Sequence, residues 1–153
     1  MPTERAPEIA MLLGSRATDG SRLGMAERND GERGAFWTLA RWAAIASMLA
    51  ITVLSTLPGT LRPHTGYSGN VEHFIAYAGA AVLIQLGLPK LRRWREVILL
   101  SVASAIFEVL QIWIPGRGSG VDNWAASTAG AVAGMMVGLA ILRLLGVKLG
   151  SGE

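Results

Sequence analysis

Glu108 places a carboxyl group within residues 97–114, an otherwise apolar run that is long enough to cross a lipid bilayer. An ionisable residue at that depth is a candidate for function, because a charge in hydrocarbon is costly. Starting from Ser101, polar side chains recur at offsets of three, seven and ten, at Ser104, Glu108 and Gln111. On a helix these four side chains share one side. We therefore expect this stripe to face protein or trapped water and not lipid.

Polar side chains from two other segments are expected at the same membrane depth. Glu72 and His73 begin the preceding apolar block, and Arg117 and Asp122 follow the block that contains Glu108. At 1.5 Å per residue, Glu108 lies about 9 Å below the end of its block, within reach of an arginine that extends toward it. We predict that these segments line one cavity, and the candidate binding residues are His73, Tyr77, Glu108, Gln111, Arg117 and Asp122.

Simpler roles compete with binding at these positions. Glu108 could be a structural link to Gln111 or Arg117, or it could be a ligand or proton site. Arg117 could neutralise Glu108, contact lipid phosphate or hold an anionic ligand. A metal site of His73, Glu108 and Asp122 would be chemically permitted, but the sequence lacks a close ligand pair such as His-x-x-x-His. We therefore predict neither a metal nor another cofactor.

Enzyme signatures are missing from the sequence. It contains no Gly-x-Ser-x-Gly elbow, no His-Glu-x-x-His helix and no phosphate-binding loop, and without cysteine it has no thiol nucleophile. We nominate no catalytic residue, and the prediction favours a binding protein over an enzyme.

Four apolar blocks supply the elements that must position these residues. The chain of 153 residues is 51% hydrophobic, and its mean hydropathy is +0.39. Each block is near the roughly 20 residues that cross about 30 Å of hydrocarbon, and the blocks are residues 42–57, 71–88, 97–114 and 124–142. We predict an all-α membrane protein with a bundle of four transmembrane helices. The expected domains are a disordered cytoplasmic tail (1–35), the four-helix transmembrane domain (36–145) and a short cytoplasmic tail (146–153).

The positions of the basic residues predict the orientation and the partners. Of the 14 Lys and Arg, six lie at or before the start of the first block, four lie between the second and third blocks, and two follow the last block. Loops 58–70 and 115–123 hold one each, so the positive-inside bias places both termini in the cytoplasm and these loops outside. The pI near 10 does not indicate a nucleic-acid-binding protein, because the basic residues flank the apolar blocks and no aromatic residues are interleaved with them for stacking on bases. Membrane lipids with anionic headgroups, or a lipid-linked envelope precursor, are the expected partners.

Small residues dominate one side of the last block. Gly130, Gly134 and Gly138 repeat every four residues, a ridge that lets another helix approach backbone to backbone. We expect the ridge to pack within the bundle, and a homodimer through the same glycines is the alternative.

In four successive segments the chain resembles the VanZ-like family of small integral membrane proteins. The family pattern is a His followed by an aromatic residue, a Glu-x-x-Gln pair, a Pro with an Arg, and an Asp before a Gly-rich last span. Here the segments are Glu72-His73-Phe74-Ile75-Ala76-Tyr77, Glu108-Val109-Leu110-Gln111, Pro115-Gly116-Arg117, and Asp122 followed by Gly130-Ala131-Val132-Ala133-Gly134. The chain differs from the pattern at Gly69 and Asn70, where many members carry Asp-Lys, and at Ser127, where Asn is usual.

The resemblance implies a multi-pass domain in the bacterial cytoplasmic membrane, and the family's named member is associated with low-level resistance to the glycopeptide antibiotic teicoplanin. With the predicted cavity, this leads to three hypotheses about function. The first is that an outward-facing polar pocket binds or shields an anionic, lipid-anchored envelope component. The alternatives are a small proton-coupled exporter and a membrane-embedded enzyme that acts on a lipid-linked substrate.

Overall fold

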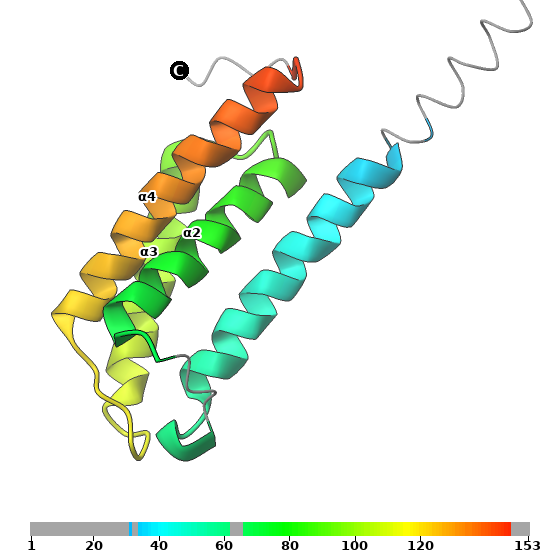
Figure 1. The fold of residues 1–153 in the computed structure, drawn as a ribbon. Helices are drawn as coiled ribbons and strands as arrows, with labels where there is room; N and C mark the ends of the chain where they lie inside the picture. The colour runs from blue at the N-terminus through cyan, green and yellow to red at the C-terminus, as the bar shows by residue number, and fades with distance from the viewer. Residues whose placement is uncertain (1–30, 32–33, 62–65, 148–153) are drawn as a thin grey trace, which may run out of the picture. The chain divides into compact units, whose positions relative to one another are not determined.

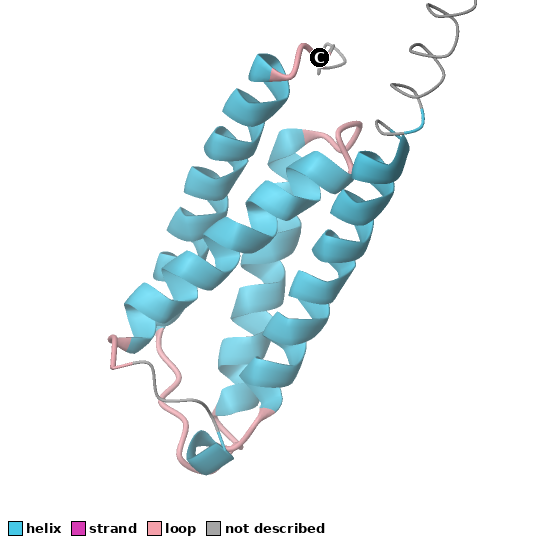
Figure 2. Ribbon diagram, turned by 45° about the vertical axis from the view of Figure 1, so that its right-hand side comes forward, coloured by secondary structure: helices cyan, strands magenta, loops and turns pink. Residues whose placement is uncertain are grey.

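The computed structural model describes residues 31, 34–61 and 66–147, and this part of the chain contains helices, turns and loops but no strand (Figure 2). The chain divides into two units, Met1–Trp37 and Thr38–Glu153. The elements, in order, are a first long helix, Gly34–Thr56, a short 3-10 helix η1, Gly59–Leu61, and the helices α2, Gly69–Gly87, α3, Arg93–Gln111, and α4, Val121–Leu144. Each predicted apolar block is therefore mainly helical.

Within the unit Thr38–Glu153, successive long helices alternate in direction (Figure 1). The connections that follow Thr56 and Gln111 lie at one end of the bundle, which we call the two-loop end. The turn that follows Gly87 lies at the other end, which we call the one-loop end. His73, Glu108 and Asp122 thus all come to the two-loop end.

The closest packing in the bundle joins α2 and α4, which run parallel. A methyl group added at Gly130 would overlap the backbone carbonyl of Phe74, and one added at Gly134 would overlap that of Ala78. At Gly138 the nearest atoms belong to the side chain of Gln85, with its Cβ 2.7 Å away. The prediction that the glycine ridge admits another helix within the bundle is confirmed, and that helix is α2. A homodimer through these glycines remains a prediction, and it would require α2 to leave them.

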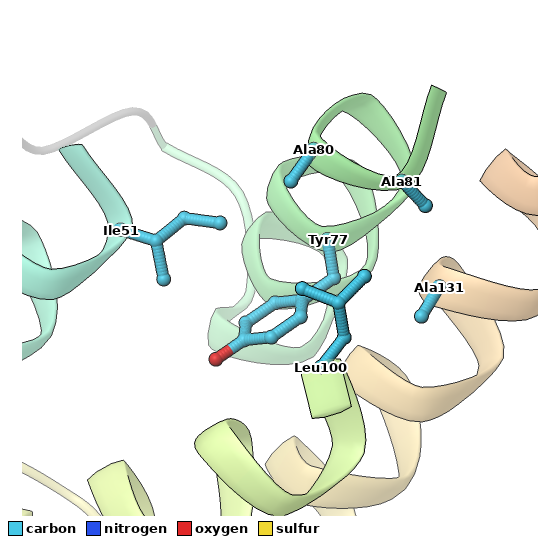
Figure 3. Packing of buried hydrophobic residues seen from close by; sticks show 6 residues of the cluster. All are labelled: Ile51, Tyr77, Ala80, Ala81, Leu100 and Ala131. Atoms are coloured by element: carbon cyan, nitrogen blue, oxygen red, sulfur yellow. The ribbon is translucent and has the colours of Figure 1, made fainter. Parts of the chain in front are cut away.

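A small apolar core lies between the polar ends of the bundle. Buried side chains from all four long helices contribute to it (Figure 3), and they are Ile51, Tyr77, Ala80, Ala81, Leu100 and Ala131. Small alanines let α2 approach its neighbours, while Leu100 and the Tyr77 ring fill the space between them. Because Tyr77 belongs to this core, it connects the packing of the bundle to the polar cluster one turn away.

The structure supports the membrane prediction in part. Among the described residues, two helices are long and apolar enough to cross a membrane, Gly34–Thr56 and Val121–Leu144. α2 and α3 do not pass the same test, since polar and charged side chains interrupt them. Four spans and cytoplasmic termini therefore remain predictions. The tails predicted for residues 1–35 and 146–153 lie mostly outside the described residues.

Candidate functional site

His73, Glu108 and Ser127 form a buried cluster where α2, α3 and α4 meet at the two-loop end. The Nε2 atom of His73 lies 3.7 Å from Oε1 of Glu108, and these side chains are 12% and 9% exposed. On the other side of the ring, Nδ1 lies 3.1 Å from Oγ of Ser127, a residue that is 0% exposed. The ring of His73 also stacks on Tyr77, with centroids 6.4 Å apart and planes inclined by 15°.

The hydrogen bonds of this cluster determine where its protons lie. Ser127 donates its hydroxyl proton to the carbonyl of Asn123 over 3.0 Å, so its oxygen can only accept from His73. In that arrangement the tautomer with a proton on Nδ1 of His73 is favoured, and Nε2 faces the Glu108 carboxyl. The second ring nitrogen of His73 thus lies against a buried carboxyl group.

Glu108 also fixes the start of α4. Its Oε2 atom accepts a hydrogen bond of 2.8 Å from the backbone N–H of Gly120, the N-cap residue of α4, whose end has no side-chain cap. A carboxylate at a helix N-terminus complements the backbone dipole. Its other oxygen, Oε1, is buried and has no hydrogen-bond partner among the described residues. This is the oxygen that faces Nε2 of His73.

Gln111 and Arg117 hold the end of the first long helix. Gln111 donates from Nε2 to the carbonyl of Ser55 over 3.1 Å. Arg117 donates from Nε to the carbonyl of Leu57 over 3.1 Å, and from Nη2 to the carbonyl of Leu54. The last carbonyls of a helix lack partners inside it, and a cation near them is favourable. Arg117 therefore has a structural role, which it performs while facing the cavity described below.

Asp122 connects the beginnings of α2 and α4. Its Oδ2 atom accepts a hydrogen bond of 3.1 Å from Nδ2 of Asn70. The neighbouring Asn123 donates from Nδ2 to the carbonyl of Gly118 over 3.2 Å, which shapes the loop before α4. These contacts keep the two parallel helices in register at the two-loop end.

Two adjacent hollows open at this end. The polar hollow has a volume of about 640 Å³, and its walls come from the connections and from the starts of α2 and α4, including Asn70, Glu72, His73, Gln111, Arg117 and Asp122. The apolar hollow has a volume of about 400 Å³ and lies between the first long helix and α2, where Ile51, Leu54, Ile75, Ala76 and Tyr77 line it. Both hollows share five lining residues, Tyr67, Glu72, His73, Gln111 and Arg117.

The structure brings the sequence-predicted residues to the same end of the bundle, but they do not all line one cavity. His73, Gln111, Arg117 and Asp122 line the polar hollow, and Tyr77 lines the apolar one. Glu108 contacts His73 and accepts a hydrogen bond from the backbone of Gly120, while a structural link to Gln111 or Arg117, one of the alternatives for this residue, stays a prediction. The prediction that the polar stripe of α3 faces protein is confirmed, because Ser104, Glu108 and Gln111 are buried. Whether these residues bind a ligand remains a prediction.

Sequence reasoning did not assign roles to Asn70 and Ser127. Both were noted as differences from the family pattern, and each now contacts a candidate residue, Asn70 with Asp122 and Ser127 with His73. Position in the pattern was the available signal, since both positions are polar in the pattern and in this chain. Ser127 is no exposed nucleophile, because it is fully buried and its proton is bound to a backbone carbonyl.

Comparison with known proteins gives a family. The family model described as VanZ/LLP1 matches residues 26–143, which is more than half of the chain. No curated protein and no solved structure matches the chain.

Proposed function

Because the chain belongs to the VanZ/LLP1 family, we propose that it is a multi-pass membrane protein that binds or shields an anionic cell-envelope component at the two-loop end. The observation that carries the proposal is the polar hollow of about 640 Å³, which draws its walls from several elements and contains a guanidinium. A concave site with a few convergent polar groups is the usual form of a ligand site. The component that we propose is a membrane lipid headgroup or a lipid-linked precursor.

Arg117 is the residue that we assign to the anion. Its bonds to the carbonyls of Leu54 and Leu57 orient the guanidinium at the wall of the polar hollow. Arginine in a fixed orientation is well suited to phosphate and carboxylate groups. His73 and Gln111 would shape the rest of the wall, with Glu108 and Ser127 holding the His73 ring.

The experiment compares a polyprenyl phosphate with the polyprenyl alcohol of the same chain length. Protein in nanodiscs of zwitterionic lipid should bind the phosphate at least about tenfold more tightly, since a charge-assisted hydrogen bond contributes about 1.5 to 3 kcal/mol. Arg117→Gln should lose this preference, and Arg117→Lys should keep most of it. Arg143→Gln, which removes a charge near the end of α4 at the one-loop end, is the matched control.

The lysine variant separates binding from structure. Neither Lys nor Gln reproduces the forked bonds to Leu54 and Leu57, so both variants lose part of that anchor, and thermal unfolding will measure the loss. If the phosphate preference falls equally in both variants, or if the alcohol binds wild type as tightly as the phosphate, the proposal is wrong.

A second candidate function rests on the buried contact between His73 and Glu108. A buried carboxyl group that exchanges protons beside an outer cavity is what a small proton-coupled exporter would need. Proteoliposomes with a pH gradient would test it: substrate-dependent proton flux that disappears in Glu108→Gln would favour the exporter. A lipid-directed enzyme remains the third hypothesis, and the exposed side chains of Ser68 and Tyr67 line the polar hollow with His73.

The proposal includes an orientation and a phenotype. With both termini cytoplasmic, reporter fusions at Gly66 and Gly120 should report outside, and those at Lys90 and the C-terminus inside. A cytoplasmic signal at Gly120 would place the hollow on the wrong side. Expression in a susceptible host should reduce teicoplanin susceptibility slightly, and Arg117→Gln should abolish the effect if the pocket is responsible.

A further inference from the structure

Basic side chains from separate parts of the chain gather at the one-loop end. They come from the first long helix, from the turn after α2 with the start of α3, and from the last turn of α4, and they are Arg41, Lys90, Arg93, Arg95 and Arg143. The fold brings these segments to the same end of the bundle (Figure 1). All five residues are exposed. Together they form one basic surface, which we call the basic end surface.

Carboxyl groups do not neutralise this surface within the described part of the chain. None of its five residues makes an ion pair with a carboxyl group there. The acid that the described segments contribute to this end is Glu96, which is 1% exposed and accepts a hydrogen bond from Gln85. Arg41 donates from Nε to the carbonyl of Gly87 over 3.3 Å, so the first long helix is tied to the turn that carries the other cations. Arg92, in the same connection, has a partner of its own and is not counted in the surface.

The border of the basic end surface is aromatic and apolar. Trp42 and Trp94 are 65% and 54% exposed, and the apolar side chains of Leu88 and Ile98 are about half exposed nearby. The guanidinium carbon of Arg95 lies 5.3 Å from the centre of the Trp94 ring. Tryptophan and basic residues at the ends of apolar helices are typical of the boundary between lipid headgroups and hydrocarbon. A soluble polyanion would meet the cations and leave this border in water, whereas a lipid surface covers both.

We propose that the basic end surface binds the headgroups of acidic phospholipids in the leaflet beside it. The anionic headgroups match the unpaired cations, and the hydrocarbon below them matches the exposed tryptophan and aliphatic side chains. Each Lys or Arg near an anionic membrane surface strengthens binding by roughly fivefold. The attraction is shared among several headgroups and requires no pocket. This inference does not depend on the anion site at the two-loop end, and it gives the molecule a second, separate contact with lipid.

The test measures lipid composition beside each end of the full chain. Because the sequence contains no cysteine, a donor dye can be attached at one introduced thiol, at Leu145→Cys for the one-loop end or at Ser119→Cys for the two-loop end. Both positions are exposed. Energy transfer to trace headgroup-labelled phosphatidylglycerol or phosphatidylcholine in mixed nanodiscs then gives the local ratio of the two lipids. At position 145 phosphatidylglycerol should be enriched at least about fivefold. The enrichment should largely disappear in 1 M salt, where the screening length is about 3 Å.

Charge variants identify the residues responsible. The triple variant Lys90→Gln, Arg93→Gln and Arg95→Gln should lose most of the enrichment at position 145. The triple variant Lys90→Arg, Arg93→Lys and Arg95→Lys keeps the charges and is the matched control, so it should retain the enrichment. If the glutamine variant unfolds in a thermal scan, the salt titration of the wild-type protein decides in its place.

The contrary results are specific. Enrichment that survives in the glutamine variant or in 1 M salt, or that is no larger at position 145 than at position 119, would overturn the proposal. Binding of poly-aspartate to the protein in zwitterionic nanodiscs, without enrichment of phosphatidylglycerol in mixed ones, would also overturn it and assign the surface to an acidic protein. A loss of phosphate preference in Arg117→Gln bears on the two-loop end alone, so the two proposals can fail separately.

Discussion

Each end of the bundle buries a glutamate of α3, yet their surroundings differ. At the one-loop end Glu96 accepts a hydrogen bond from Gln85, and its other oxygen is buried without a partner among the described residues. At the two-loop end Glu108 faces His73 and accepts from the backbone of Gly120. Both carboxyl groups are buried, but only Glu108 lies beside residues that line the two hollows.

The difference shows what distinguishes a site from a buried polar contact. Glu96 lies in the first turn of α3, and its partner is a neutral amide on α2. Glu108 contacts a titratable ring whose other nitrogen is fixed by Ser127, and that ring forms part of both hollows. A buried carboxyl alone is therefore a weak indication of function, and a carboxyl that holds a cavity-lining side chain is a stronger one.

Lysine substitution should give the largest difference between the two ends. A lysine within a span costs about 2.5 to 3.5 kcal/mol, and at position 108 it would also face His73 and the positive N-terminal end of α4. At position 96 a long side chain can extend toward the end of the helix. We expect Glu108→Lys to lose most folded protein, Glu96→Lys to lose clearly less, and Glu108→Gln to fold well, as measured by yield and thermal unfolding in detergent. Equal recovery of Glu108→Lys and Glu108→Gln would mean that Glu108 is not buried.

The glycine ridge offers an intermediate effect. Gly130→Ala places a methyl group against the backbone of Phe74, which cannot move aside alone, whereas Gly138→Ala meets the side chain of Gln85. Overpacking costs about 1 to 3 kcal/mol, so the free energy of unfolding should fall more for Gly130→Ala than for Gly138→Ala. Gly79→Ala, which has open space around it, is the control and should be neutral or stabilising by up to about 1 kcal/mol. A larger loss for Gly138→Ala than for Gly130→Ala would show that α2 and α4 pack less closely at Gly130 than at Gly138.

Ser127→Ala should cost no more stability than Gly130→Ala and should give a distinct spectroscopic change. It leaves Nδ1–H of His73 without its acceptor, a loss of about 1 to 3 kcal/mol when the group stays buried. Thr128→Ala, which removes a hydroxyl contact of 2.8 Å with Ser101, is the comparison. Nitrogen NMR of His73 should find Nδ1 protonated in wild type and a changed tautomer balance in Ser127→Ala. An unprotonated Nδ1 in wild type would refute the proton assignment of the cluster.

Much of the arrangement could be predicted from the sequence, because the spacing of apolar and polar residues within a segment indicates a helix and the side of it that is buried. The helices of the apolar blocks, the buried side of α3 and the approach of His73 to Glu108 all follow from spacing and from the cost of polar groups in an apolar setting. The partners of Arg117 and the second partner of Glu108 could not be predicted, since they are backbone groups of Leu54, Leu57 and Gly120. A backbone carbonyl or N–H has no residue-specific signal, and its position depends on where each helix ends.

Photo-cross-linking tests the central claim most directly, because it reports which end of the bundle binds. A polyprenyl phosphate with a diazirine near the phosphate would be irradiated with the wild-type protein in nanodiscs, and labelled peptides would be located by mass spectrometry. We predict labels in residues 66–77 and 111–123, removed by excess unlabelled phosphate but not by the alcohol. Labels concentrated around Gln85 and Glu96, or labels that the unlabelled phosphate does not remove, would contradict the assignment of the site to the two-loop end.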